Sequence, residues 1–127
     1  MKIALIGYGK MGIIRHNAIS EIGKNFKLIA ISEPAFGSRL KEIPNVSHEE
    51  ILDNPEIDIV IICTPNYLNK PLTIRALNAG KHVFCEKPPA FTATDMEEIR
   101  TAEQKSNGRK LMYGFNHRHH DSIIRMK

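Results

Sequence analysis

The stretch Ile3-Ala4-Leu5-Ile6-Gly7-Tyr8-Gly9-Lys10-Met11-Gly12 decides the fold of this 127-residue chain. Its apolar run predicts a buried strand, and the residues after it fit the pattern G-x-G-x-x-G. In a strand–turn–helix unit, Gly7 permits the tight turn, Gly9 lets a pyrophosphate approach the backbone, and Gly12 lets helix and strand pack closely. The following helix N-terminus offers free N–H groups to phosphates. The alternative is a glycine-rich turn that binds nothing.

Four further apolar runs follow the first at intervals that suit strand, crossover helix and strand. They occupy residues 28–31, 59–62, 82–85 and 111–113. Most are continuous rather than alternating, as in a parallel sheet that is covered on both faces. With a weak strand near Val46, the pattern predicts an α/β fold: a Rossmann-like, doubly wound parallel sheet of about six strands.

The segments between these runs predict helices with recognisable starts and ends. Capping-box patterns open helices at Ser47 and at Thr94, and glycines follow the ends of the periodic stretches. Pro71 is expected in the first turn of its helix, where a missing N–H costs little. We expect residues 1–120 to form one dinucleotide-binding domain and residues 121–127 to begin a truncated helix that leads to an absent second domain.

Composition narrows the class of protein. Apolar residues make up 42% and charged residues 25% of the chain, which is ordinary for a globular domain. No apolar run is long enough to span a membrane, and a strand beginning at Lys2 leaves no room for a signal peptide. Two cysteines do not make a disulfide framework, so we expect a cytoplasmic protein. Cys63 and Cys85 are expected to be small buried apolar residues.

The formal net charge of +4 is unevenly distributed. Residues 105–127 hold six basic residues and one acidic residue, so they carry +5, while residues 1–104 hold twelve basic and thirteen acidic residues, so they carry −1. The basic end could contact ligand phosphates, but no nucleic-acid-binding motif accompanies it. We therefore expect no nucleic-acid partner.

An acidic residue completes the dinucleotide-binding pattern. Glu33 lies 21 residues after Gly12, directly after the second predicted strand. Its carboxylate would accept hydrogen bonds from the adenosine ribose and repel a 2′-phosphate, which favours NAD over NADP. Arg39 is close enough in sequence to accommodate a phosphate, so NADP stays possible. The alternative is that Glu33 is a solvated loop acid.

Two more polar segments follow strands, at the edge where ligands bind in open α/β sheets. Cys63-Thr64-Pro65-Asn66 offers hydrogen-bonding groups in a turn that proline stiffens. Glu86-Lys87-Pro88-Pro89 places a lysine that could hold a carbonyl oxygen or transfer a proton. An ordinary turn and a solvated charged loop are the alternatives. We also expect Lys87-Pro88 or Pro88-Pro89 to be cis.

These segments resemble the N-terminal half of the Gfo/Idh/MocA oxidoreductases, the family of glucose–fructose oxidoreductase and inositol dehydrogenase. The matching stretches are Lys2 to Gly12, Thr64 to Asn66, Ala79-Gly80-Lys81-His82-Val83-Phe84-Cys85-Glu86-Lys87-Pro88, and Gly114-Phe115-Asn116-His117-Arg118. The resemblance implies NAD or NADP binding, and substrates such as sugars, cyclitols and nucleotide-linked sugars. It also implies a second domain, absent here, that supplies most of the substrate site and a proton-transfer Asp/His pair.

The resemblance also assigns roles to residues. Lys87 would be catalytic and contact both cofactor and substrate, Glu86 would fix its loop and the cofactor, and Asn116 and Arg118 would enter the active-site cleft. The remaining cofactor contacts are expected in the two turns and at the acid after the second strand: Gly7, Tyr8, Gly9, Lys10, Met11, Gly12, Glu33, Cys63, Thr64, Pro65 and Asn66. At the position of Asn69 the family commonly has a histidine.

Three histidines near the C-terminus, His117, His119 and His120, match no standard zinc spacing, so no metal is expected. We expect the chain to bind cofactor without turning over substrate alone. The alternative function is a non-catalytic dinucleotide-binding or sensor module. A coenzyme A or nucleotide domain has no need of the Glu86-Lys87-Pro88 loop. The longer protein is expected to form homo-oligomers, and this chain a monomer with a frayed end or a weak, salt-dependent dimer through Ile123, Ile124 and Met126.

Overall fold

A five-stranded parallel sheet forms the centre of the molecule. The computed structural model describes residues 1–37, 39–40, 42–116 and 120–126, without the side chains of Arg39 and Ile123. The strand order is β2-β1-β5-β6-β7, and each neighbouring pair is parallel. The strands are β1 (Lys2–Ile6), β2 (Lys27–Ser32), β5 (Ile59–Ile62), β6 (His82–Cys85) and β7 (Leu111–Tyr113).

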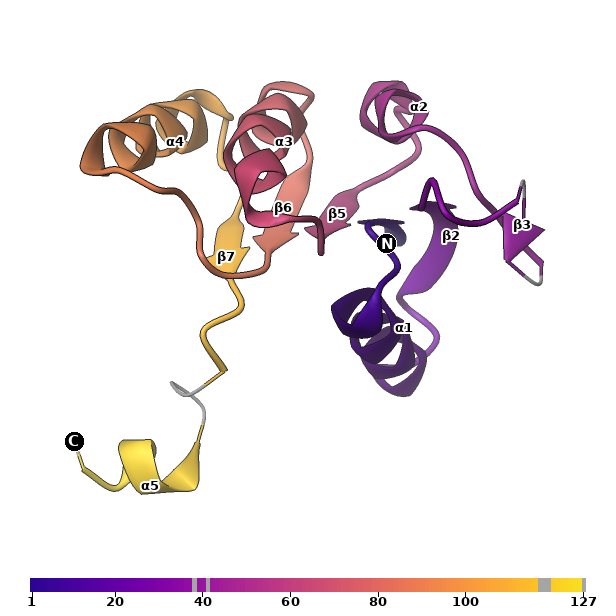
Figure 1. The fold of residues 1–127 in the computed structure, drawn as a ribbon, viewed down its shortest axis with the longest axis horizontal. Coiled ribbons are helices and arrows are strands. Elements are labelled where there is room, and N and C mark those ends of the chain that lie inside the picture. The colour runs from indigo at the N-terminus through magenta and orange to yellow at the C-terminus, as the bar shows by residue number, and fades with distance from the viewer. Residues whose placement is uncertain (38, 41, 117–119, 127) are drawn as a thin grey trace.

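Helices cover both faces of this sheet, as expected for a doubly wound fold (Figure 1). One face carries α1 (Lys10–Glu21), and the other carries α2 (His48–Asp53), α3 (Asn66–Asn78) and α4 (Ala93–Lys105). Alternate residues of β1 enter two separate apolar clusters, Ile3 and Leu5 on one face and Ala4 and Ile6 on the other. A strand buried on both faces has to be apolar at every position, which explains the continuous runs in the sequence.

The sixth strand expected near Val46 is reduced to a single bridge. Asn45 pairs with Ile31 in parallel fashion, and the Val46 N–H donates to the Ile31 carbonyl at 2.9 Å. Just before it, β3 (Arg39–Leu40) and β4 (Ile43–Pro44) form a small antiparallel pair. Pro44 has no N–H for a longer ladder, and Ser47 already caps α2. The main sheet therefore has five strands, with this bridge at the outer side of β2.

Two details of the expected helices are wrong. The capping box of α4 is built from Thr92 and Asp95, two residues before the predicted one at Thr94. Both threonines fit the pattern, but Asp95 also pairs with Lys70 on α3 at 2.6 Å, which favours the earlier start. Pro71 lies inside α3 rather than in its first turn, because the helix already begins at Asn66. The capping box at Ser47 is confirmed.

Lys81, the first of the two lysines in the stretch that ends at Pro88, is a structural residue. It is only 2% exposed, and its Nζ donates to the carbonyls of Asn54 at 2.6 Å and Ile57 at 3.1 Å. These carbonyls follow the end of α2, so the ammonium closes the connection that leads into β5. Burial lowers the pKa of Lys81, as desolvation does for any cation.

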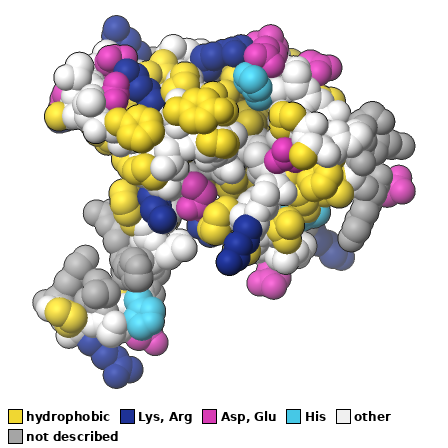
Figure 2. Space-filling model, in the orientation of Figure 1, with side chains coloured by type: hydrophobic (Ala, Val, Ile, Leu, Met, Phe, Trp, Pro, Cys, Tyr) yellow, Lys and Arg dark blue, Asp and Glu magenta, His cyan; other side chains and the backbone are white. Residues whose placement is uncertain are grey.

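The C-terminal segment stands apart from the sheet. The short helix α5 (Asp121–Ile124) lies away from the body in Figures 1 and 2. Ile124 is 54% exposed and Met126 80% exposed. The expected weak dimer stays a prediction. Within the described residues, no helix combines the length and apolar character needed to cross a membrane.

Candidate functional site

The polar segments singled out in the sequence meet at one edge of the sheet. Gly7 follows β1, Glu33 follows β2, Cys63 follows β5, Glu86 follows β6 and Gly114 follows β7. Because all five strands are parallel, these positions are neighbours along the carboxyl edge. This is the edge where open α/β sheets bind their ligands.

The glycine-rich turn has the geometry that its pattern predicts. Gly7 has φ +89°, and a Cβ there would lie 2.5 Å from the Cys63 carbonyl oxygen. A Cβ on Gly12 would lie 2.4 Å from the Gly7 carbonyl oxygen. A Cβ on Gly9, in contrast, would have nothing within 4 Å. The outer two glycines are therefore needed for packing, while Gly9 leaves its backbone open to a ligand.

The N-terminus of α1 is available to an anion. Gly9 is its N-cap, no side chain among the described residues caps it, and its first turn contains no acidic residue. The first amides of a helix lack partners within the helix, so those of Lys10, Met11 and Gly12 can serve a ligand. By contrast, α2 and α4 satisfy their first amides with capping boxes. The helix that follows the glycine-rich turn is thus left open where phosphates would bind.

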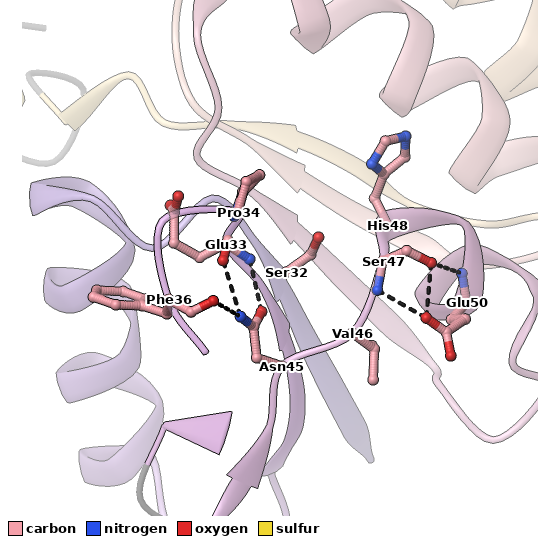
Figure 3. A pocket seen from close by; sticks show the side chains of 9 residues that line it. All are labelled: Ser32, Glu33, Pro34, Phe36, Asn45, Val46, Ser47, His48 and Glu50. Carbon is pink, nitrogen blue, oxygen red and sulfur yellow. Dashed lines mark hydrogen bonds between the residues drawn. The ribbon is translucent and has the colours of Figure 1, made fainter. Parts of the chain in front are cut away.

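Glu33 lies beside this turn and is held by backbone groups. Its Oε2 accepts the Tyr8 N–H at 2.8 Å, and its Oε1 accepts the Ala35 N–H at 3.2 Å. The Asn45 side chain holds the loop after Glu33: it accepts the Glu33 N–H at 2.9 Å and donates to the Gly37 carbonyl at 2.7 Å. Glu33 and Asn45 line one pocket of about 440 Å³ (Figure 3).

Tyr8 acts as a support within the turn. It is 8% exposed, its hydroxyl pairs with Nδ1 of His16, and its ring meets that of Phe36 edge-on at 6.0 Å. Burial raises the pKa of Tyr8, so its phenol stays protonated at neutral pH. Tyr8 therefore fixes the glycine-rich turn against α1 and against the loop after Glu33. His16 supports Tyr8 from α1.

Asn69 holds the loop that carries Lys87. Asn69 is fully buried, and its Nδ2 donates to the Glu86 carbonyl at 3.1 Å and to the Pro88 carbonyl at 2.8 Å. Its Oδ1 accepts the Thr64 hydroxyl at 3.2 Å. One amide thus binds the backbone on either side of Lys87 and links it to the turn after β5. The Lys87-Pro88 bond is cis, one of the two expected possibilities.

Glu86 and Lys87 are adjacent in the chain, but Glu86 is buried and Lys87 is exposed to solvent. Glu86 is 7% exposed and forms an ion pair with Arg15, whose Nε lies 2.7 Å from Oε1. Lys87 is exposed and has no hydrogen bond or ion pair with any residue that the structure describes. Its ammonium is therefore available to a ligand at this edge.

The C-terminal part of the site is described only in part. Oδ1 of Asn116 accepts a hydrogen bond from Nη2 of Arg15 at 3.3 Å, which places Asn116 next to Glu86. Arg118, His117 and His119 lie outside the described residues, as does the Arg39 side chain. Among the residues that are described, no three His, Cys, Asp or Glu side chains gather to hold a metal ion.

Comparison with known proteins now identifies the family. A sequence profile described as an oxidoreductase family with an NAD-binding Rossmann fold (GFO_IDH_MocA) matches residues 1–115. The chain belongs to the Gfo/Idh/MocA oxidoreductase family. The matched domain is an NAD-binding Rossmann fold, as predicted from the sequence, and the resemblance found there is confirmed.

The relatives of this Gfo/Idh/MocA chain include dehydrogenases of cyclitols. It is 26% identical to inositol 2-dehydrogenase of Salmonella typhimurium, and the match covers 100% of this chain and 40% of that protein. It is 32% identical to the NADP(+)-dependent scyllo-inositol 2-dehydrogenase of Bacillus subtilis, over 83% of this chain and 31% of that protein. Among solved structures, an NAD-binding oxidoreductase from Klebsiella pneumoniae superimposes with a TM-score of 0.87 at 29% identity, covering 100% of this chain and 37% of that one. The chain thus spans well under half of each relative.

Cys63 and Cys85 lie at the carboxyl ends of β5 and β6, and both thiols are neutral near pH 7. Both thiols are free; Cys85 is fully buried and Cys63 is half-buried. Burial raises the pKa of Cys63 to about 12 and that of Cys85 to about 11, and the nearby Glu86 carboxylate adds to both shifts. A thiolate is therefore disfavoured at either position, which agrees with the expected apolar role.

Three residues that position the site carried no recognisable signal in the sequence: Arg15, Asn45 and Asn69. Arg15 lies outside the glycine pattern, and Asn45 resembles any turn asparagine. Asn69 stood out only as a departure from the family's histidine. Each acts on a partner that is distant along the chain, so its role depends on the folded arrangement.

Proposed function

We propose that this chain is the cofactor-binding part of a dehydrogenase that moves hydride between NAD and the carbinol carbon of a sugar, cyclitol or nucleotide-linked sugar. The observation that carries the proposal is the open N-terminus of α1 beneath Gly9, with Glu33 and Lys87 along the same edge. The names of the inositol dehydrogenases among the relatives support the substrate class.

The cofactor would span the edge from β2 to β6. Its pyrophosphate would lie against Gly9 and the amides of Lys10 and Met11, where the helix dipole favours negative charge. Glu33 would accept the ribose hydroxyls, and its charge, held in place by the Tyr8 N–H, favours NAD over NADP. One relative is named as an NADP(+)-dependent enzyme, so we retain NADP as the second candidate cofactor.

Lys87 would be the catalytic residue. Bound NAD supplies the hydride acceptor, and the protein has to activate the alcohol and control its proton. The Lys87 ammonium is exposed at the sheet edge, while the carbonyls of Glu86 and Pro88 on either side are fixed by Asn69. It can therefore hold the carbinol oxygen: the ammonium would donate a proton to that oxygen when a carbonyl is reduced, and the amine would take the alcohol's proton in the opposite direction. Asn116 and Arg118 would contact the substrate from the segment after β7.

The complete reaction would need a substrate domain beyond the cofactor domain. The chain spans about 40% of its inositol dehydrogenase relative, which supports cofactor binding without turnover by these residues alone. Two free thiols support a cytosolic location. Exposed Ile124 and Met126 favour a weak dimer of the chain as given, and sedimentation at low and high salt tests it.

Calorimetric titration with NADH and NADPH tests the cofactor assignment. We expect NADH to bind more tightly, and binding of neither cofactor at millimolar concentration would overturn the proposal. In a longer protein that contains this chain, Lys87→Ala should lose about 10²–10⁴-fold in turnover, the usual contribution of one proton-transfer group. Lys105→Ala, an exposed change at the end of α4, is the control. Cofactor binding without any turnover in the longer protein would favour the sensor module instead.

A further inference from the structure

We propose that Arg15 is the positioning residue for the nicotinamide half of the site and ties it to the helix that receives the pyrophosphate. The inference rests on the proposed function, because it assumes that the cofactor lies along the carboxyl edge. Arg15 would not touch the cofactor's reacting atoms. It would act through Glu86 and Asn116, and so through the loop that carries Lys87.

Arg15 and Glu86 form a short ion pair that is largely shielded from solvent. Nε and Nη2 of Arg15 lie 2.7 Å and 2.5 Å from Oε1 of Glu86. The Arg15 side chain is 18% exposed and that of Glu86 is 9% exposed. Two donors on one carboxylate fix direction as well as distance, and solvent screens such a pair far less than a surface pair.

Arg15 makes two further contacts, one with Phe84 and one with Asn116. Its guanidinium carbon lies 4.8 Å from the centre of the Phe84 ring on β6, within the range of a cation–π contact. Nη2 also donates to Oδ1 of Asn116 at 3.3 Å. Arg15 on α1 thus contacts β6, the loop after β6 and the segment after β7. A lysine has neither the planar fork nor the flat face for this set of contacts.

The carboxylate of Glu86 is nearly buried between Arg15 and the backbone after β7. A Cβ on Gly114 would lie 2.6 Å from Oε2 of Glu86, so the carboxylate is enclosed between α1 and the backbone after β7. The Glu86 N–H donates to the Ile62 carbonyl at 2.9 Å, and its own carbonyl is held by Asn69. Removing Arg15 would leave this enclosed carboxylate without its counter-charge. We expect the loop, and Lys87 with it, to shift as the carboxylate moves towards solvent.

The arrangement separates the two ends of the cofactor. Gly9 and the first amides of α1 lie before Arg15 in the helix, and Arg15 makes no hydrogen bond, ion pair or ring contact with the glycine-rich turn or Glu33 among the residues that the structure describes. Loss of Arg15 should therefore weaken contacts to the nicotinamide end and leave contacts to the ADP-ribose end in place. A general structural role would weaken both ends together.

Titrations with NADH and with ADP-ribose, which lacks the nicotinamide, test this separation. For Arg15→Met, we expect NADH affinity to fall by about fivefold or more, a usual size for coupling between sites, and ADP-ribose affinity to stay within about twofold. Arg15→Lys should recover only part of the loss. Asn116→Ala, a change at an exposed position, should produce a smaller loss of the same kind. Arg100→Ala, an exposed arginine on α4, should change neither affinity.

Three outcomes would overturn the inference. Equal losses for the two ligands would show that Arg15 only stabilises the fold. Unchanged NADH affinity in folded Arg15→Met, checked by circular dichroism, would remove its positioning role. If Arg15→Met does not fold, Asn116→Ala and Arg15→Lys decide, and the absence of a selective NADH loss in both would contradict the inference. Failure of the unchanged chain to bind either ligand would instead refute the proposed function.

Discussion

Around β1 and β2, the carboxyl edge is shaped by glycines, and around β5 and β6 it is shaped by buried polar side chains. In the first region, Gly7 and Gly12 are needed because a Cβ would strike backbone at 2.5 Å and 2.4 Å. In the second region, Asn69 and Arg15 hold the loop of Glu86 and Lys87 through hydrogen bonds and an ion pair. The first region depends on the absence of a side chain at two glycines. The second depends on hydrogen bonds and an ion pair between buried polar groups.

The two regions are therefore disrupted by opposite kinds of substitution. Added atoms disrupt the glycine-rich turn, because its backbone segments are already in contact. Removed atoms disrupt the Lys87 loop, because buried carbonyls and a carboxylate then lose their partners. Substitutions in each region therefore test this contrast.

Gly7→Ala should have the largest effect. The new methyl would meet the Cys63 backbone and occupy a left-handed conformation at φ +89°. Steric overlap and conformational strain together should lower the free energy of unfolding by about 3–5 kcal/mol. Urea denaturation measures the change.

Gly9→Ala is the matched control for Gly7→Ala. Gly9 has φ −72° and nothing within 4 Å of a Cβ, so alanine should leave stability nearly unchanged. NADH affinity should still fall, because the methyl would occupy the space left for the pyrophosphate. Equal destabilisation by the two substitutions would contradict the distinct roles assigned to these glycines.

Asn69→Leu tests the polar region. The carbonyls of Glu86 and Pro88 would lose their donor inside the protein, and the Thr64 hydroxyl would lose its acceptor. Unsatisfied buried groups of this kind should lower the free energy of unfolding by about 3 kcal/mol. Asn78→Leu, at the exposed end of the same helix, is the control and should change stability little. A stable Asn69→Leu chain with unchanged NADH affinity would show that the Lys87 loop does not depend on this amide.

Raising the pH should lower the free energy of unfolding through the thiols of Cys63 and Cys85. The folded pKa values of Cys63 and Cys85 are raised to about 12 and about 11, above the ordinary value for an unfolded thiol. Above about pH 9 the unfolded chain therefore releases protons that the folded chain retains, so stability falls as pH rises towards the folded pKa values. Between about pH 8 and pH 10, the two thiols should lower the free energy of unfolding by about 2 kcal/mol.

Urea denaturation at the two pH values measures this slope. A chain with Cys63→Ala and Cys85→Ala should lose most of it, while the lowered pKa of Lys81 acts in the opposite direction in both chains. An unchanged slope in the double variant would assign the pH dependence to other groups. Both thiols should also react slowly with a thiol reagent near neutral pH in the folded chain.

Glu33→Gln should have the smallest effect on stability and a specific effect on cofactor choice. Glutamine keeps an acceptor for the Tyr8 N–H but removes the charge that repels a 2′-phosphate. The ratio of NADPH to NADH affinity should rise about tenfold, which corresponds to about 1.4 kcal/mol. Glu42→Gln, an exposed change nearby in the chain, is the control for overall charge. A ratio that does not change would leave Glu33 without the selectivity assigned to it.

Local patterns in the sequence predict the fold class and most positions of the candidate site. Continuous apolar runs identify strands buried on both faces, and parallel strands bring their carboxyl ends to one edge. The glycine-rich turn, Glu33 and Lys87 could therefore be placed on that edge from local patterns alone.

The contacts that hold these residues in place follow from the tertiary structure. It selected Thr92 over Thr94 as the cap of α4, because Asp95 also reaches Lys70. It paired Arg15 with Glu86, 71 residues away, and placed Asn69 between two carbonyls of the Lys87 loop. A local pattern records which conformation a segment prefers. The partner of a buried polar group is set by which segments the fold brings together, and that information appears only when the chain is packed.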